Sequence, residues 1–263
     1  MKTVLITGAS SGIGESFANK FAERKHNLLL VARNAEKLER LCEQLTKKFG
    51  VVAQYITADL AKRETAEHVF AETQNRGLEI DILINNAGIG SGGAFSDLPL
   101  ESELDLLQLN ISSLVALTHL FLPQMQQRKS GTIVNVSSMA GLMPIPYMAT
   151  YAASKMFVRS FTEAIAEECK SYNIHVMLLI PGLTRTNFNH ASGIDGVRAS
   201  SEYDSSTQTS DQVVSEALKA LDNKKHFVVS GRKNKLNAKL SALIPNSFAT
   251  KMYARAFINK TKI

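Results

Sequence analysis

The segment at residues 7–14, Thr-Gly-Ala-Ser-Ser-Gly-Ile-Gly, constrains the fold more than any other stretch. It follows the apolar run at residues 4–6 and precedes a segment, residues 13–21, with apolar side chains at helical spacing. Three glycines let the backbone approach a bulky group, and the free N–H groups of a helix start suit a phosphate. An ordinary Gly-rich strand-to-helix turn has the same pattern. The spacing also differs from the G-x-G-x-x-G of the general dinucleotide fingerprint.

Apolar runs alternate with helical segments along the whole chain. The runs lie at residues 4–6, 28–31, 51–56, 80–84, 132–136, 174–180 and 227–229, and the expected helices at 13–21, 38–45, 61–75, 101–128, 151–169 and 211–221. Fully apolar strands that alternate with helices predict a parallel sheet covered on both faces. We therefore expect an α/β fold, a doubly wound seven-stranded parallel sheet of the Rossmann type in three α/β/α layers, as one domain over residues 1–263.

Unusual residues follow six of the predicted strands. They are the glycines of residues 8–14, then Arg33, Asp59, the run Asn86, Ala87 and Gly88, Ser138, and the pair Pro181 and Gly182. In a doubly wound sheet, ligands bind beyond the carboxyl ends of the strands. The sequence therefore predicts one binding cleft at that edge.

Tyr151 and Lys155 lie four residues apart in a predicted helix, so they share one face. A nearby ammonium stabilises a phenolate, so such a pair can move a proton near neutral pH. As a bare pattern, Tyr-x-x-x-Lys is usually a coincidence of the surface. Ser138 can offer a hydroxyl at the same cleft, whereas Asn110 stands inside the helix at 101–128, where Asn is mildly unfavourable and often caps or faces solvent.

Taken in order, these motifs resemble the short-chain dehydrogenase/reductases over about residues 2–187. The resemblance implies that Tyr151 exchanges the proton with the substrate oxygen and that Lys155 lowers its pKa and binds the nicotinamide ribose. It implies that Ser138, rather than Ser137, polarises the carbonyl and that Asn110 holds a water in a proton relay. The implied cofactor contacts are Gly8, Ser10, Ser11, Gly12, Ile13, Gly14, Arg33, Asn34, Asp59, Leu60, Asn86, Ala87, Gly88, Tyr151, Lys155, Pro181, Gly182, Thr184 (through its backbone) and Thr186.

The end of the second strand indicates which nicotinamide cofactor is used. It reads Val-Ala-Arg33-Asn34, without the carboxylate that binds the ribose 2′-OH of NAD, and Arg33 can pair with a 2′-phosphate. We therefore predict NADP(H). The alternative is that Arg33 is a solvated residue at the start of the next helix.

Composition excludes several other functions. Cys42 and Cys169 are expected to be reduced packing residues, and six scattered histidines give no metal-binding pattern. The first strand begins close to Met1 and no uninterrupted apolar run has the length of a membrane span, so we expect no secretory signal and a cytoplasmic protein. No recognised nucleic-acid-binding module is present.

Two segments fall outside the regular alternation. Residues 187–210 have no clear periodicity and are expected to form a lid over the cleft, or else an insertion without a role. Residues 232–263 form a basic amphipathic segment, and residues 223–263 hold ten Lys and Arg but no Asp or Glu. We favour packing on the domain or an oligomer contact for this segment over peripheral membrane binding.

We thus expect an NADPH-dependent carbonyl reductase or alcohol dehydrogenase with a small-molecule ketone or alcohol substrate. The side chains of Met139, Leu142, Met143, Ile145 and Tyr147 favour an apolar substrate. The resemblance implies a dimer or tetramer joined through the helices at 101–128 and 150–170. The alternative functions are a non-catalytic NADP(H) sensor, and an interaction protein that uses its basic tail on a membrane or an acidic partner.

Overall fold

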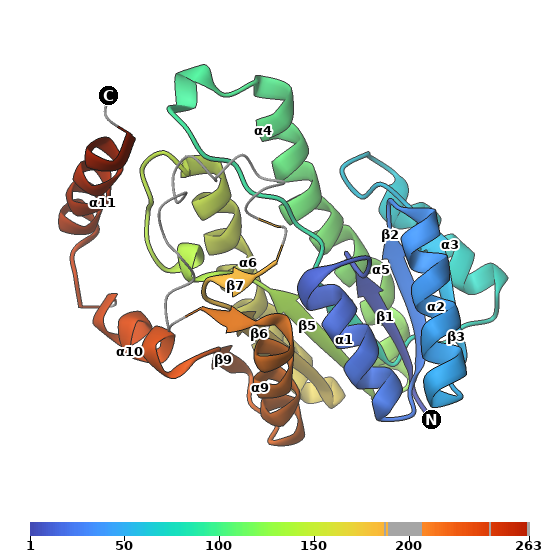
Figure 1. The fold of residues 1–263 in the computed structure, drawn as a ribbon. Coiled ribbons are helices and arrows are strands. Elements are labelled where there is room, and N and C mark those ends of the chain that lie inside the picture. Colours follow the sequence, from blue (N-terminus) through green and yellow to red (C-terminus); the bar gives the residue numbers. More distant parts are fainter. Residues whose placement is uncertain (187, 189–206, 242, 262–263) are drawn as a thin grey trace.

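A seven-stranded parallel sheet forms the centre of the molecule, as the sequence predicted (Figure 1). The computed structural model describes residues 1–186, 188, 207–241 and 243–261. The strand order is β3-β2-β1-β4-β5-β6-β9. The strands are β1 (Thr3–Thr7), β2 (Asn27–Ala32), β3 (Ala53–Thr57), β4 (Ile82–Asn85), β5 (Gly131–Val136), β6 (Ile174–Ile180) and β9 (Phe227–Val229). The order reverses beside β1, so a ligand-binding crevice is expected between β1 and β4.

Helices cover both faces of the sheet and make three layers. On one face lie α1 (Gly12–Glu23), α2 (Ala35–Phe49) and α9 (Ser210–Asp222), and on the other α3 (Thr65–Asn75), α5 (Ser113–Gln127) and α6 (Ala149–Glu168). Successive residues of β1 point to opposite sides: Val4 and Ile6 join the first core and Leu5 joins the second. All three are fully buried, which explains the continuous apolar runs in the sequence.

The helix predicted over residues 101–128 is interrupted at Asn110. It comprises α4 (Leu100–Leu107), a π-helical turn η2 (Gln108–Ser112) that contains Asn110, and α5. Across its length, Leu100–Gln127 is long and apolar enough to cross a membrane, the one such helix within the described residues. Here Leu117 and Phe121 are buried against the sheet, so core packing accounts for its apolar character.

The chain after β6 departs from the predicted pattern. Most of the expected lid, residues 187 and 189–206, lies outside the described residues. Its last residues are regular rather than loop-like, because β8 (Gln208–Thr209) pairs with β7 (Thr184–Arg185) and α9 begins at Ser210. After β9, α10 (Arg232–Ser241) and α11 (Asn246–Thr261) extend along the left side of Figure 1.

Short 3-10 turns complete the described elements: η1 (Phe95–Asp97), η3 (Met139–Leu142) and η4 (Cys169–Tyr172). Cys42 and Cys169 are both buried and free, as expected from the sequence.

Candidate active site

The Gly-rich turn between β1 and α1 is fixed by the end of β4. The Oγ1 atom of Thr7 accepts hydrogen bonds from the backbone N–H groups of Asn86 and Ala87, both at 3.0 Å. In return, Asn86 Nδ2 donates to the carbonyl of Thr7 at 2.9 Å. The side chain of Asn86 thus holds the turn in place, while the backbone that follows it borders the crevice between β1 and β4.

Each glycine of the turn has its own geometric reason. Gly8 and Gly12 have φ values of +66° and +60°, in the left-handed region that side chains disfavour. A Cβ atom at Gly14 would lie 2.2 Å from the carbonyl oxygen of Gly8, so only glycine lets α1 approach the turn. Ser11, the N-cap of α1, makes no side-chain capping bond. The first amides of α1 are therefore available to a phosphate.

Tyr151 and Lys155 stand one turn apart on α6, and both are buried at 7% and 5% exposure. The Lys155 ammonium donates to the carbonyl of Val136, at the end of β5, at 3.1 Å. Burial lowers the pKa of Lys155 to about 8, because desolvation penalises its charged form. The two predicted residues are thus buried on the same helix, and Lys155 contacts the end of β5.

Ser137 and Ser138 follow β5, and their hydroxyls do different things. Ser137 Oγ is buried and donates to the carbonyl of Lys155 at 2.7 Å, which ties β5 to α6. Ser138 Oγ accepts from the N–H of Ala140 at 3.1 Å, and its proton is not used in that bond. Ser138 is therefore the better placed of the two to donate to a substrate.

Asn110 is buried behind the site, and its side chain is fully engaged. Its Oδ1 accepts from the N–H of Ile89 at 3.0 Å, and its Nδ2 donates to the carbonyl of Ile89 at 2.9 Å and to Ser154 Oγ at 3.0 Å. The π-helical turn points this side chain inward, so neither capping nor solvent exposure explains it. Asn110 joins the strand end after β4 to α6.

The end of the crevice beside β2 is basic. Arg33 and Lys37 are exposed at the start of α2, and neither makes an ion pair among the described residues. The Asn34 side chain caps α2 by accepting from the N–H of Lys37 at 2.8 Å, so part of its polar capacity serves the helix. Asp59 accepts from the N–H of Ala61 at 3.2 Å, beside the buried Leu60.

One cavity of about 470 Å³ brings most of the predicted residues together. Its lining includes Gly8, Ser10, Ser11, Gly12, Ile13, Arg33, Asn34, Asp59, Leu60, Asn86, Ala87, Gly88, Ser138, Tyr151, Lys155, Pro181, Gly182, Thr184 and Thr186. Gly14 and Asn110 do not line it. Gly14 lets α1 pack closely against the turn that does, and Asn110 holds the backbone of Ile89. The cavity runs from Arg33 to Tyr151 past the start of α1, an arrangement that fits an extended dinucleotide.

The substrate end is apolar, but several of its residues differ from those predicted. The lining includes Ile89, Leu109, Met139, Ala140, Met148 and Phe188. The ring of Phe188 lies 5.8 Å from that of Tyr151, centroid to centroid. Of the five apolar residues predicted to flank the substrate, only Met139 lies in this lining. Leu142 instead packs in the cluster near α10, and Ile145 packs beside Tyr151.

Sequence reasoning missed Lys37 and Met148, and it included Phe188 only as part of the expected lid at residues 187–210. Lys37 stands one helical turn after Arg33, a spacing that could have indicated a second cation at the adenosine end. Met148 ends the irregular stretch before α6, and Phe188 falls in a segment without periodicity. No periodic signal in the sequence identifies either of them.

Fold and site together define the class of dinucleotide-dependent oxidoreductases. A family model described as short chain dehydrogenase matches residues 2–195. The chain therefore belongs to the short-chain dehydrogenase/reductase family, whose members are oxidoreductases that use a nicotinamide cofactor on small-molecule substrates.

Several curated relatives act on lipid-like compounds, to judge by their names. The chain is 36% identical over 193 residues to the very-long-chain 3-oxoacyl-CoA reductase of Anas platyrhynchos, covering 72% of this chain and 61% of that protein. It is 34% identical over 217 residues to human 17-beta-hydroxysteroid dehydrogenase type 3, and this match covers 81% of this chain and 66% of the human protein. The chain thus spans less than two thirds of the duck relative's length.

Solved structures show the same fold. A short-chain dehydrogenase from Sphingobium yanoikuyae in complex with NADPH superposes with a TM-score of 0.80 at 34% identity, covering 87% of each chain. A bulky-bulky ketone specific alcohol dehydrogenase from Comamonas testosteroni superposes with a TM-score of 0.78 at 30% identity, and the match covers 92% of this chain and 93% of that one.

Proposed function

We propose that this protein is an NADPH-dependent reductase of apolar ketones, or the corresponding alcohol dehydrogenase. The observation that carries the proposal is the single cavity that starts at a basic adenosine end and finishes at buried Tyr151 and Lys155. A bound nicotinamide would supply the hydride. A non-catalytic sensor would not need Ser138, Tyr151 and Lys155 gathered at one end of the cavity.

The protein's own residues then handle the oxygen of the substrate. Tyr151 exchanges the proton with that oxygen, and the Lys155 ammonium stabilises the phenolate form of Tyr151. Ser138 donates to the same oxygen and stabilises charge that develops on it. Asn110 keeps Ile89 and Ser154 in register, so that α6 presents Tyr151 at a fixed position.

The choice of NADPH rests on charge at the end of β2. Arg33 and Lys37 can pair with a 2′-phosphate, and no carboxylate at that strand end repels it. We expect a specificity constant kcat/KM for NADPH about 10- to 100-fold above that for NADH, the range that charge-assisted hydrogen bonds to one phosphate supply. Arg33→Asp should reverse this preference, so that kcat/KM is higher for NADH than for NADPH. The control Arg63→Asp changes an exposed residue outside the cavity lining and should leave the preference unchanged. A preference of the unaltered enzyme for NADH would refute NADPH dependence.

The proposed substrate class rests on the apolar lining around Tyr151. The names of two relatives support it, because one is a very-long-chain 3-oxoacyl-CoA reductase and the other a 17-beta-hydroxysteroid dehydrogenase. The test is NADPH oxidation across a panel of steroid ketones, long-chain 3-oxoacyl thioesters, bulky aryl ketones and short polar ketones. Higher kcat/KM for the apolar members is expected. Turnover confined to short polar ketones would contradict the proposal.

We also propose that the enzyme is a homo-oligomer. Met156 and Phe157 on α6 keep 36% and 39% of their surface exposed, side by side on a core helix. Such a pair suits a contact with a second copy. Sedimentation equilibrium of the protein and of Phe157→Ser checks this; a monomeric unaltered protein would contradict it.

A further inference from the structure

The two C-terminal helices leave apolar side chains exposed. We call residues 232–261, which form α10 and α11, the C-terminal arm. On α10, Leu236 and Leu240 are 60% and 49% exposed, and they lie one turn apart. On α11, Phe248 and Met252 repeat that spacing at 62% and 46%. These four side chains are therefore not packed on the domain, and an oligomer contact or a membrane surface remains as their partner.

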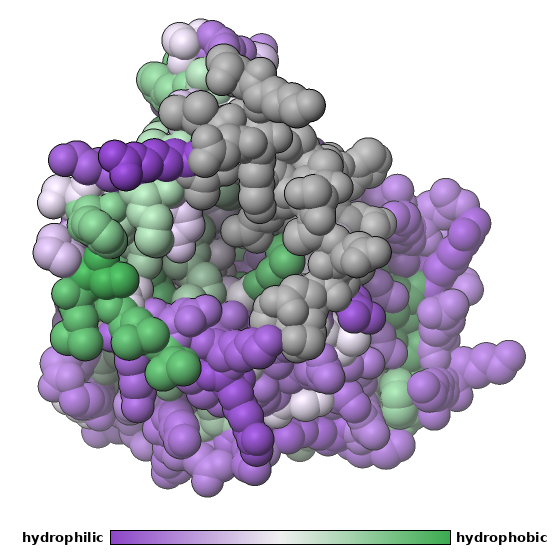
Figure 2. Space-filling model, turned by 60° about the vertical axis from the view of Figure 1, so that its left-hand side comes forward, coloured by the Kyte–Doolittle hydropathy of each residue, from purple (hydrophilic) through white to green (hydrophobic). Residues whose placement is uncertain are grey.

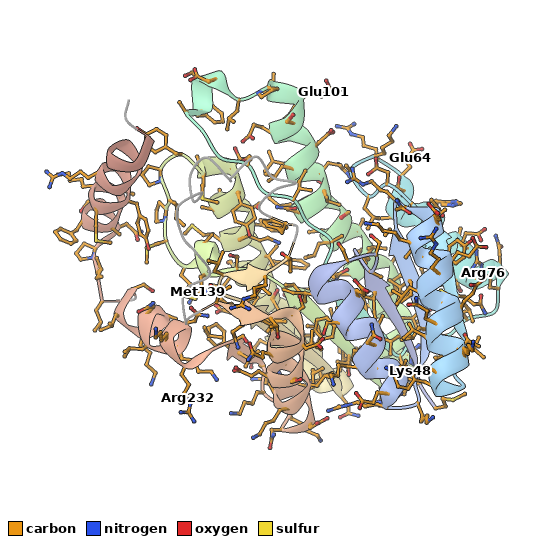
Figure 3. The ribbon with its side chains drawn as sticks, in the orientation of Figure 1. Lys48, Glu64, Arg76, Glu101, Met139 and Arg232 are labelled. Atoms are coloured by element: carbon orange, nitrogen blue, oxygen red, sulfur yellow. The ribbon has the colours of Figure 1, made fainter. Side chains whose placement is uncertain are left out.

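The inner side of α10, by contrast, is attached to the body. Asn234 is buried on α10, and Ala238 packs with Met139 in the cluster beside η3 (Figure 3). On α11, Ala249 is 1% exposed. The exposed leucines of α10 thus lie on the outer face of a helix that the body holds in place, and α11 continues the chain from that helix.

The arm is also uniformly basic. Between residues 232 and 255 it carries six Lys and Arg and no Asp or Glu. Among the described residues, Lys239, Lys251 and Arg255 make no ion pair. Arg232 extends from the foot of α10 away from the body (Figure 3). Figure 2 shows a green apolar band on its left side, where the arm comes forward, bordered by purple side chains.

Charge decides between the two partners that an apolar surface of this kind suits. In a two-fold symmetric dimer, the same patch meets itself. A second copy seated on the arm would bring Lys and Arg against Lys and Arg without a single acid from the arm to compensate. An anionic lipid surface instead complements the cations and accepts the apolar side chains between its headgroups.

We propose that the C-terminal arm binds the surface of membranes that contain anionic lipids. The segment from η1 to the first turns of α4 supports this orientation, because Phe95, Leu100 and Leu104 are 65%, 69% and 55% exposed there. Both α4 and α11 project beyond the carboxyl edge of the sheet, where the cavity lies (Figure 1). A membrane bound at the arm would therefore lie toward the edge of the sheet that holds the cavity. The proposal does not depend on which cofactor or substrate the enzyme uses.

The test is vesicle co-sedimentation of the full chain, with phosphatidylcholine vesicles and with vesicles that contain 30% phosphatidylserine. Binding to the anionic vesicles at low salt is expected, with much weaker binding to the neutral ones. Half-molar NaCl should weaken it strongly, because the screening length falls to a few ångströms. Absence of binding to anionic vesicles at low salt would overturn the proposal.

Variants separate the two contributions. Lys251→Gln with Arg255→Gln should weaken binding about 30-fold at low salt, from the attraction of two basic residues to an anionic surface. Phe248→Ser with Met252→Ser should weaken it about tenfold or more for each side chain. Lys47→Gln with Arg63→Gln removes the same charge from exposed positions outside the arm and should change binding little.

Folding and self-association are checked on the same samples. Far-UV circular dichroism and NADPH binding should be unchanged in all variants, since none touches the cavity lining. Equal loss of binding in the Lys47/Arg63 control would contradict the proposal. So would a dimer, seen by sedimentation velocity, that Phe248→Ser dissociates while no vesicle binding is found, because the arm would then be a contact between copies.

Discussion

Lys155 carries its amino group in a buried position at the end of β5, with the Val136 carbonyl 3.1 Å away. Desolvation, rather than a neighbouring charge, lowers its pKa from 10.5 to about 8. The role proposed for Lys155 uses its charged form, which this buried position disfavours. Such conflicts between stability and function concentrate at active sites.

This conflict predicts how stability changes with pH. Between pH 8 and 10.5 the unfolded chain keeps a proton on Lys155 that the folded chain releases, so folding stability rises with pH in that window. Relative to Lys155→Met, the free energy of unfolding of the cofactor-free enzyme should rise by about 3 kcal/mol in total. Urea unfolding at pH 7.5 to 10.5 measures it. The control Lys47→Met changes an exposed lysine, so its free energy of unfolding should vary with pH as that of the unaltered protein does. If the difference in this free energy between the unaltered protein and Lys155→Met did not change with pH, Lys155 would not be desolvated.

Tyr151 gives the prediction for the chemical step. Tyr151→Phe keeps the ring that packs against Phe188 and removes the hydroxyl. Turnover should fall by at least about 10²- to 10⁴-fold, the usual contribution of a positioned acid or base, while NADPH binding changes little. Steady-state assays with an apolar ketone and NADPH fluorescence titration separate the two. Near-normal turnover would refute the assigned role.

At the scale of elements, the loop after β6 is pressed against α10. A Cβ atom at Gly182 would lie 2.1 Å from Nδ2 of Asn234, whose side chain is buried and donates to the carbonyl of Ser230 at 2.7 Å. Gly182 lines the cavity, whereas Asn234 belongs to the C-terminal arm. The cofactor loop and the arm thus share one close contact.

Gly182→Ala should therefore destabilise the protein by about 1–3 kcal/mol through overpacking and weaken NADPH binding. Adding Asn234→Ala removes the clashing side chain, so the double variant should regain much of the loss. Urea unfolding of the four proteins in this cycle gives the coupling energy. Additive effects of the two substitutions would mean that Gly182 and Asn234 do not constrain each other.

The regular helices and strands were predictable because the apolar residues of each element follow the spacing of that type of element. The central strands were predictable because burial on both faces makes them largely apolar, as in β1. The residues that line the cavity were predicted because most of them stand at strand ends or at fixed helical spacing. The π-helical turn at Asn110 was missed, since an inserted residue changes a helix without changing its composition. The contributions of Met148 and Phe188 come from irregular chain that no period describes.

For the whole molecule, the arm is where the sequence leaves most alternatives open. Amphipathic spacing alone does not say which side of a helix the body covers. In the structure, Asn234 is buried and Ala238 packs in the cluster around Met139, whereas Leu240 and Phe248 are exposed. The basic and apolar outer face therefore becomes available to a partner, while the inner face remains part of the fold.

The two helices of the arm should consequently differ in what their removal does. A chain that ends at Ile244 loses α11 but keeps the contacts of α10 with Gly182 and η3, so its catalytic domain should stay folded and bind NADPH. A chain that ends at Gly231 also loses Asn234 and Ala238, which uncovers the cluster around Met139 and the cofactor loop. Thermal unfolding and NADPH titration of both chains test this difference. Equal loss of NADPH binding in both would mean that α11 supports the site directly, and no loss in either would mean that α10 does not hold the Gly182 loop.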